Sequence, residues 1–259
     1  MDEALKNNPT FEVLGVEIDL IHVEAVVDTI DRWIQEKQIG RFVVATGMHG
    51  IMESRRNPRF RIILDSADLF VPDGISLVWA ARLRGRRGLK RVSGPDLMRA
   101  CLKHFETRGY KHFFYGDTWD TLELLAKQLL SEHPGLEIAG YQSPPFRQLT
   151  PEEDEEEIRL INESGADMLW VGLGLPKQEQ WIYEHLDRLE IPVCIGVGAA
   201  FKFLSGRVNR APAWVGNNGF EWAWRLVQEP RLVGRRVFID GTRFIGHLAL
   251  EMMGFKKYL

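Results

Sequence analysis

The chain has 259 residues, of which 45% are hydrophobic, and this is enough for one large globular domain with or without an appendage. No stretch approaches the roughly 18 apolar residues of a spanning helix, and no basic segment followed by an apolar run opens the sequence, so we expect a cytoplasmic protein that is neither secreted nor membrane-inserted. The two cysteines, Cys101 and Cys194, lack a neighbouring Cys/His cluster, which argues against a metal site or a disulfide framework.

The net charge of −3 is distributed unevenly along the chain. Residues 205–259 contain nine Lys/Arg and four Asp/Glu, a local balance of +5, so residues 1–204 carry −8. This asymmetry predicts an anionic partner for the C-terminal segment. The acidic run at 152–157 follows Pro151 and is typical of a solvated first helical turn.

The first part of the chain predicts, in order, a hairpin over 10–21, a helix over 23–34, a strand over 41–45, a helical region ending at Arg56, a helix over 58–66, a strand over 70–72 and a helix over 75–83. Two of these strands end in polar residues, Thr46 and Asp73. The carboxyl ends of strands are where ligands bind in open α/β sheets, so both residues are candidates for a site.

Strands and helices then alternate regularly, with strands predicted over 111–115, 136–141, 167–171 and 193–197 and helices over 93–108, 119–132, 151–162 and 176–189. Strands separated by single helices predict parallel pairing through right-handed crossovers. The expected fold is therefore α/β, a Rossmann-like and mostly parallel sheet with flanking helices. We expect residues 1–204 to form the catalytic domain and residues 205–259 a basic, Trp-rich helical appendage that docks on a membrane.

Asp73 is the best candidate for a catalytic base, because a carboxylate at a crevice edge can take a proton from a hydroxyl. Capping of the following helix is the competing interpretation, and the sequence alone favours it. Thr46 could bind a sugar hydroxyl or cap a helix. His49 ranks second as a base, because a lone His without a visible partner is more often structural.

Two further segments carry polar residues at predicted helix starts. Arg91, Gly94 and Asp96 belong to an Arg-Val-Ser-Gly-Pro-Asp segment that could contact an oxyanion or a phosphate or could simply cap a helix. Glycine-rich strand ends precede another helix start, and its polar residues fit either a nucleotide or an exposed first turn. The residues concerned are Gly116, Gly172, Gly198, Lys177, Gln178 and Glu179.

Several nucleotide and metal motifs are absent from the sequence. There is neither a GxGxxG nor a P-loop lysine motif, so dinucleotide binding and ATP hydrolysis have no support. No two aspartates lie two residues apart, so a DxD-type site for a divalent cation is missing. The charge of a leaving group would then have to be met by cations such as arginine.

Long blocks of the sequence resemble the WecG/TagA/CpsF glycosyltransferases. The resemblance covers nearly the whole chain after residue 10 and rests on Thr46 and on VPDGISLVWAARLRG (71–85), RVSGPDL (91–97), GLGLPKQEQWI (172–182), GVGAAFKFLSG (196–206) and RAPAWVGNNGFEWAWRLVQEPRLVGRR (210–236). It implies an inverting, metal-independent transfer of a sugar from a UDP-sugar to an undecaprenyl-diphosphate-linked saccharide, at the cytoplasmic membrane face, in surface polysaccharide synthesis. No cofactor besides the donor and no nucleic acid partner are expected.

The resemblance also implies roles for single residues. It makes Asp73 the base and Thr46 an active-site residue, and it places Gln178 by the nucleotide or donor sugar. Arg91 would lie at the active-site pocket, and the tail arginines Arg225, Arg231 and Arg235 would contact the diphosphate.

One position departs from the family pattern. The family usually has Asn two residues after the threonine, and Met48 stands there in this chain. The loss of an amide that could bind a sugar leaves the donor sugar, the acceptor sugar and the linkage unassigned. A non-catalytic nucleotide-sugar-binding or scaffold protein of a polysaccharide assembly complex is the alternative function, and the oligomeric state stays open.

Overall fold

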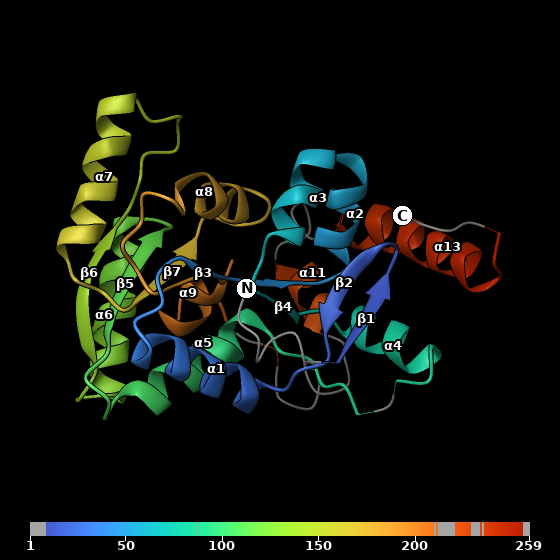
Figure 1. Ribbon diagram of the computed structural model, residues 1–259, viewed down its shortest axis with the longest axis horizontal. Coiled ribbons are helices and arrows are strands. Elements are labelled where there is room, and N and C mark those ends of the chain that lie inside the picture. Colours follow the sequence, from blue (N-terminus) through green and yellow to red (C-terminus); the bar gives the residue numbers. More distant parts are fainter. Residues whose placement is uncertain are drawn as a thin grey trace.

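We analysed a computed structural model of the chain, which describes residues 9–86, 88–209, 211, 221–228, 234 and 236–255 (Figure 1). The predicted division of the chain at residue 205 therefore falls just before a segment that is only partly described. The predicted tail contacts Arg231 and Arg235 lie outside the described residues, as does the side chain of Arg225.

Six parallel strands form the central sheet, in the order β4-β3-β8-β7-β5-β6. Their bounds are β3 Arg41–Thr46, β4 Leu69–Pro72, β5 Lys111–Gly116, β6 Glu137–Gln142, β7 Met168–Gly172 and β8 Val193–Gly196. Every residue of β4, β7 and β8 is buried, as expected for parallel strands covered on both faces. The α/β fold with a parallel sheet is confirmed, and each predicted strand lies within one or two residues of its place.

Helices cover both faces of this sheet and complete three layers (Figure 1). One face carries α1 Val23–Gln35, α5 Gly94–Phe105, α6 Trp119–Glu132 and α9 Ala200–Leu204, and the other carries α2 Met48–Arg56, α3 Pro58–Asp65, α7 Pro151–Glu163 and α8 Lys177–His185. Two separate clusters of buried residues match these two layers. In α1, Val26, Ile30 and Trp33 fall on one side of the helix at helical spacing, which explains why that side is buried.

A two-stranded antiparallel hairpin precedes the sheet, with β1 at Thr10–Val13 and β2 at Val16–Asp19. Leu14 and Gly15 both have positive φ angles, 51° and 84°, as a tight two-residue turn between twisted strands requires. Asp19 joins the hairpin to β4, because its Oδ2 accepts a hydrogen bond of 2.8 Å from the backbone N–H of Phe70. Burial raises the pKa of the Asp19 carboxyl to about 6.

The C-terminal helix α13, Gly241–Met252, packs on the body of the protein. Phe244 and Leu248 are buried and belong to the same core cluster as Ile51 and Met52 of α2. Glu251, near the other end of α13, forms an ion pair with Arg84 and accepts a hydrogen bond from the backbone N–H of Leu14. The helix is therefore held to the body by an apolar stripe and by a polar contact near its end.

Other apolar side chains of α13 and of the residue after it are exposed, namely Ile245, Met252 and Met253. Two further C-terminal elements are described in part, α11 Glu221–Gln228 and the π-helical turn η2 Arg236–Asp240. No helix in the described part of the chain combines the length and the apolar character needed to cross a membrane.

We expect Leu248→Ala to lower the free energy of unfolding by roughly 2–4 kcal/mol, because it removes a buried side chain and leaves a cavity under α13. Leu250→Ala is the matched control, since Leu250 lies on the same helix and is 39% exposed, and we expect it to change stability by less than about 1 kcal/mol. Urea unfolding of both variants measures the difference. Equal effects of the two substitutions would mean that α13 does not pack in this register.

Candidate functional site

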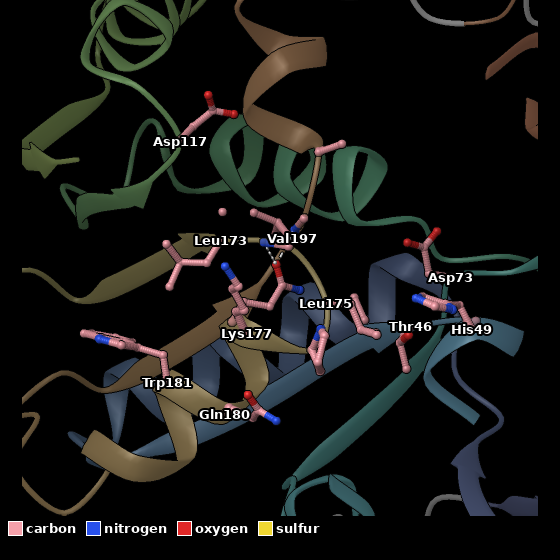
Figure 2. Close-up of a pocket in the computed structure, with 18 of the residues that line it drawn as sticks. Thr46, His49, Asp73, Asp117, Leu173, Leu175, Lys177, Gln180, Trp181 and Val197 are labelled. Carbon is pink, nitrogen blue, oxygen red and sulfur yellow. Dashed lines mark hydrogen bonds between the residues drawn. The ribbon is translucent and has the colours of Figure 1, made fainter. Parts of the chain in front are cut away.

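A large cleft of about 2030 Å³ opens at the carboxyl edge of the sheet. The ends of β3, β4, β5, β7 and β8 contribute to its wall, together with residues 144–151, α4 Ile75–Leu83 and α13. Figure 2 shows Thr46, His49 and Asp73 on one side of this cleft and Lys177, Gln180 and Trp181 on the other. The cleft therefore brings together residues from most of the segments that the sequence predicted as sites.

Asp73 follows β4 directly and lines the cleft. Its backbone N–H donates a 3.0 Å hydrogen bond to the carbonyl oxygen of Thr46, so the residue continues the β3-β4 ladder beyond the last strand pair. The N-cap position of α4 is Gly74, which has no side chain to cap the helix. The interpretation of Asp73 as a helix cap is wrong, and its carboxylate lies at the cleft instead.

Two glycines allow the ends of β3 and β4 to approach this closely. A Cβ atom built on Gly47 would lie 3.0 Å from the Cα of Gly74, and one built on Gly74 would lie 3.1 Å from the Cα of Gly47. Any larger residue at either position would force the two loops apart. This backbone contact places the residue before Gly47 and the residue before Gly74, Thr46 and Asp73, beside each other.

Thr46 is the last residue of β3 and is 4% exposed. Capping is wrong for this residue too, because Gly47 is the N-cap of α2 and no side chain caps that helix. Gly50, one turn into α2, leaves the space that the Thr46 side chain occupies: a Cβ at Gly50 would come within 2.4 Å of Thr46 Oγ1. The threonine is thus held in a fitted position at the cleft wall.

His49 has a partner that the sequence did not reveal. Its Nδ1 lies 2.7 Å from Oδ2 of the buried Asp240, and the other oxygen of Asp240 pairs with Arg56. Asp240 is the last residue of η2, so the contact joins the C-terminal segment to α2. The expectation that His49 stands alone is wrong, and a carboxylate holds its imidazole at the cleft.

Met48, the residue that departs from the family pattern, lines the cleft and packs against the core. A Cβ built on Gly241 would lie 3.7 Å from the terminal methyl of Met48. The methionine therefore provides an apolar contact for the first turn of α13.

Gln178 braces the loops that follow β7 and β8. Its Oε1 accepts hydrogen bonds from the N–H groups of Gly174, at 3.2 Å, and Gly198, at 2.9 Å. Both glycines have positive φ angles, 77° and 55°. Gln178 is 2% exposed, so its amide acts mainly on the loops that line the cleft.

Glu179 lies behind Gln178 and is fully buried. Its Oε1 accepts a 2.8 Å hydrogen bond from Gln178 Nε2, and burial raises the pKa of its carboxyl to about 7. Glu179 does not line the cleft, so it supports Gln178 and does not meet a ligand. Of the two interpretations, an exposed first turn holds for Lys177 but not for Gln178 and Glu179, which are buried.

Glycines at the strand ends serve close packing as much as ligand access. A Cβ at Gly116, where φ is 120°, would lie 2.7 Å from the backbone of Gly172, and a Cβ at Gly172 would meet the ring of Phe201 at 2.6 Å. Of these two glycines, Gly172 lines the cleft and Gly116 does not. The two glycines therefore let the ends of β5 and β7 and the ring of Phe201 pack closely together at the cleft.

The segment at 91–96 combines a cleft residue with a helix cap. Arg91 lines the cleft, and the neighbouring Val92 N–H donates to the carbonyl oxygen of Pro72, which fixes Arg91 beside the end of β4. Ser93 caps α5 and accepts a 3.3 Å bond from the N–H of Asp96, whose carboxylate lies 3.8 Å from Arg91. Asp96 does not line the cleft and orients Arg91 from behind.

Gly94 has a packing role at the start of α5. A Cβ there would lie 2.9 Å from the carbonyl oxygen of Val197, just after β8. Gly94 does not line the cleft. It lets α5 begin close to the edge of the sheet.

Two lysines border the glycine loops. Lys177 begins α8 and Lys202 lies in α9, and both line the cleft. Neither has an ion-pair partner within 4.0 Å among the residues that the structure describes. Lys202 was missed in the sequence, although it lies in the GVGAAFKFLSG block, because apolar residues flank it on both sides.

Asp117 was missed as well. It follows β5, lines the cleft and has a positive φ of 55°, which is uncommon for a residue other than glycine. Its side chain accepts a 2.8 Å hydrogen bond from the N–H of Thr118. The end of β5 is therefore a second strand end that delivers a carboxylate to the cleft, and an Asp shortly after a predicted strand was the available signal.

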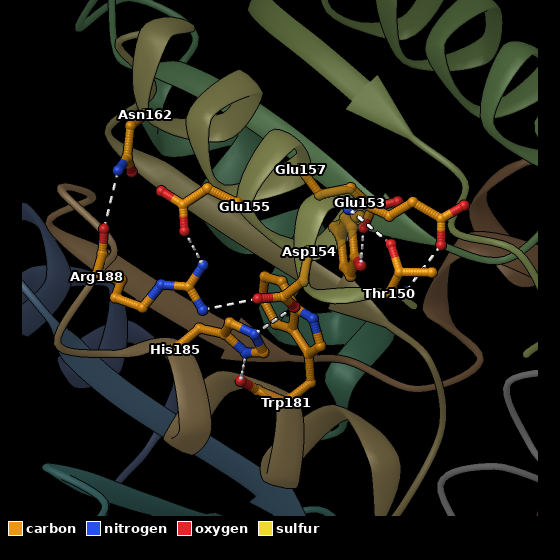
Figure 3. A network of polar contacts seen from close by, with 10 residues as sticks. Thr150, Glu153, Asp154, Glu155, Glu157, Asn162, Trp181, His185 and Arg188 are labelled. Carbon is orange, nitrogen blue, oxygen red and sulfur yellow. Dashed lines mark hydrogen bonds and ion pairs between the residues drawn. The ribbon is translucent and has the colours of Figure 1, made fainter. Parts of the chain in front are cut away.

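A network between α7 and α8 stiffens the far wall of the cleft (Figure 3). Asp154 accepts from Arg188 at 2.7 Å and lies 2.8 Å from His185 Nε2. Burial opposes ionisation of Asp154, but the hydrogen bonds from Arg188 and His185 hold the pKa of its carboxyl below the usual value. The acidic run at 152–157 is therefore more than a solvated first turn, because one of its residues, Asp154, makes ordered contacts with Arg188 and His185.

Trp181 lies inside this wall. Its ring stacks with Tyr115, at a centroid distance of 4.3 Å, and with His185, at 4.6 Å. These two contacts hold the indole as a rigid part of the wall. Tyr115 is held in turn by Glu157.

Across the described residues, no group of three or more His, Cys, Asp or Glu side chains is arranged to hold a metal ion. The charged cleft residues with described side chains are Asp73, Asp117, Asp154, Glu184, Arg91, Arg147, Arg188, Lys177 and Lys202. Of these, Arg147 is engaged by Glu153, and Arg188 by Asp154 and Glu155.

Comparison with known proteins gives matches over most of the chain. The model of the glycosyl transferase WecG/TagA/CpsF family matches residues 11–258. An N-acetylglucosaminyldiphosphoundecaprenol N-acetyl-beta-D-mannosaminyltransferase of Bacillus spizizenii is 30% identical over 217 residues, which are 83% of this chain and 82% of the relative. Proteins of the same name from Bacillus subtilis and Staphylococcus aureus are 27% and 26% identical and cover 81% and 90% of this chain and 80% and 90% of their own length.

The buried Glu179 predicts a pH dependence of stability. Its pKa is about 7 in the folded protein against an ordinary 4.5, so the folded state holds this proton more tightly, and stability falls as pH rises from 4.5 to 7. At 1.36 kcal/mol per pKa unit, the loss is of the order of 3 kcal/mol. Glu179→Gln retains a carbonyl for Gln178 and does not titrate, so we expect the variant to become progressively more stable relative to the wild type across this range.

Urea unfolding at pH 5, 6, 7 and 8 measures this difference. Titration of Asp19 is common to both proteins and cancels. Glu123→Gln, at an exposed position on α6, controls for the loss of a charge alone. A stability difference between Glu179→Gln and the wild type that does not change with pH would contradict the assignment.

Proposed function

The chain belongs to the WecG/TagA/CpsF family of glycosyl transferases, and from this premise we propose that it transfers a sugar from a UDP-sugar to a saccharide carried on a polyprenyl diphosphate. The observation that carries the proposal is the placement of Asp73 and Thr46 side by side at the edge of a cleft that also holds two glycine loops and two lysines. A base, a hydroxyl-binding residue and an anion-binding segment are the parts that this reaction needs.

The acceptor class follows from the relatives. Their shared name describes transfer of N-acetylmannosamine to N-acetylglucosaminyldiphosphoundecaprenol. We propose a polyprenyl-diphosphate-linked sugar as the acceptor of this chain and leave the sugars open, because Met48 replaces the family's asparagine at the cleft. The pathway would be the synthesis of a surface polysaccharide.

Asp73 would act as the base of a single displacement. Its carboxylate takes the proton of the acceptor hydroxyl, the acceptor oxygen bonds to the anomeric carbon of the donor, and the bond from that carbon to the diphosphate oxygen breaks, so that UDP leaves and the configuration inverts. Thr46 would bind a sugar hydroxyl beside Asp73. No metal ion is required by this scheme.

The diphosphate of UDP would lie over the glycine loops. The glycine loops that Gln178 braces and the side chains of Lys177 and Lys202 line the cleft. Fixed cations stabilise a leaving diphosphate because they need no rearrangement when its charge develops. Arg225, Arg231 and Arg235 remain proposed contacts of the same diphosphate.

We place the enzyme at the inner face of the cell membrane, docked through its basic C-terminal segment. The charge of +5 over residues 205–259 and the exposed Met252 and Met253 support contact with an anionic bilayer.

We expect Asp73→Asn to lower kcat by roughly two to four orders of magnitude, because the amide retains the shape of the carboxylate but cannot accept the proton. Binding of UDP should change little, since the glycine loops and lysines are untouched. Transfer from a panel of UDP-hexoses to lipid-linked acceptors, followed by mass spectrometry in buffer with EDTA, measures turnover, and calorimetry measures UDP binding.

His49→Gln is the comparison, because His49 is another titratable residue on this side of the cleft. A larger loss in His49→Gln than in Asp73→Asn would move the base to His49. Turnover near the wild-type level in folded Asp73→Asn would show that Asp73 is not the base. Binding of UDP without transfer by the wild-type protein from any donor of the panel would favour the scaffold alternative. Activity lost in EDTA and restored by Mg²⁺ would show that a metal takes part.

A further inference from the structure

One side of α4 is apolar and packs against the core only at Ile75, while Trp79 and Leu83 are exposed. Ile75, Trp79 and Leu83 recur every fourth residue and therefore share one side of the helix, while Leu77 and Ala81 on other sides are buried. Trp79 is 49% exposed and Leu83 is 62% exposed. All three line the catalytic cleft, so this stripe (Ile75, Trp79 and Leu83) is an apolar extension of the site.

The C-terminal helix supplies a second apolar lining. Phe244, Ile245 and Leu248 of α13 line the same cleft, and Ile245 is 67% exposed. In Figure 1, α4 and α13 both lie at the end of the molecule that carries the hairpin. The cleft is thus polar along the sheet edge and apolar where these two helices border it.

Two buried or half-buried acids hold α13 in place against this extension. Asp240, directly before α13, binds His49 and Arg56 of α2. Glu251, near the end of α13, binds Arg84, the residue that ends α4. The second contact joins the ends of α4 and α13 directly, so the two apolar linings are fixed relative to each other.

We propose that the α4 stripe and Ile245 form a track for the first isoprene units of the acceptor lipid. This proposal rests on the proposed function, because it takes the acceptor to be a polyprenyl diphosphate. The group that binds along this track is the hydrocarbon chain of the acceptor lipid. The surrounding bilayer is a separate binding partner.

Continuity with the catalytic residues supports this occupant. Ile75 lies two residues after Asp73, so the stripe begins where the acceptor hydroxyl would react and runs about 12 Å along the axis to Leu83. Arg91 lies beside the end of β4 and could meet the acceptor's own diphosphate. Asp73, Arg91 and the stripe therefore border one part of the cleft, and the acceptor likewise combines a sugar, a diphosphate and an isoprenoid in one chain.

Charged residues near the end of α4 also support a lipid chain that runs from Ile75 towards Leu83. Arg82, Arg86 and Lys90 are exposed around the end of α4 and after it. Basic residues next to exposed Trp and Leu side chains are typical of a membrane interface. The lipid would leave the track towards the bilayer there.

The test compares two acceptors that carry the same sugar diphosphate, one on undecaprenol and one on a short alkyl chain of a single isoprene length, in detergent micelles with the full-length protein. We expect Trp79→Ser/Leu83→Ser to raise KM for the undecaprenyl acceptor at least tenfold and to leave KM for the short acceptor within twofold. Trp119→Ser is the matched control, because Trp119 is 47% exposed on α6 and does not line the cleft, and it should change neither KM.

Any other outcome contradicts the proposal that the stripe binds the isoprenoid chain. Equal losses on both acceptors would mean that the stripe positions the catalytic residues, and no loss in micelles combined with a loss on vesicles would mean that it contacts only the bilayer. Circular dichroism and thermal unfolding of the variants exclude misfolding.

A measurement without catalysis separates this proposal from the proposed function. A photoreactive isoprenoid diphosphate without a sugar should crosslink to α4 or α13, with competition by undecaprenyl diphosphate, and mass spectrometry locates the site. Crosslinking there without any transfer activity would retain the track and reject the proposed reaction. Crosslinking only elsewhere would reject the track, whether or not transfer occurs.

Discussion

The contact between Gly47 and Gly74 is the constraint on which the candidate site depends. Two strand ends can place their last side chains at one point only if the loops that follow them nearly touch, and here a Cβ on either glycine would lie about 3 Å from the other Cα. The contact sets Thr46 beside Asp73, and Gly50 then makes room for the threonine side chain. Backbone packing, more than side-chain bonding, therefore builds the proposed catalytic pair.

On the side of the cleft opposite Asp73, buried hydrogen bonds hold the loops in place. Gln178 joins the loops after β7 and β8 through two N–H groups, and Glu179 holds Gln178 from within the core. A neutral acid is the form that burial favours for Glu179, so the loops stay fixed without a buried charge. The C-terminal helix completes the cleft, because Asp240 and Glu251 tie it to α2 and to the end of α4.

The sequence was sufficient to predict the order of strands and helices along the chain, because buried parallel strands are short apolar runs and each ends at a polar or glycine residue. It also identified Asp73 and Thr46 as residues at strand ends, although their alternative role as caps could be rejected only once Gly74 and Gly47 were seen at the cap positions. The sheet order and the contact of His49 with Asp240, 191 residues away, could not be predicted, since neither leaves a local pattern.

The central claim is a single displacement at Asp73, and the anomeric configuration of the product tests it most directly. With a UDP-sugar whose anomeric bond is α, NMR of the purified lipid-linked product, read from the one-bond carbon–proton coupling at the new anomeric carbon, should show a β linkage. An α linkage would require two displacements or a front-side mechanism and would contradict the account.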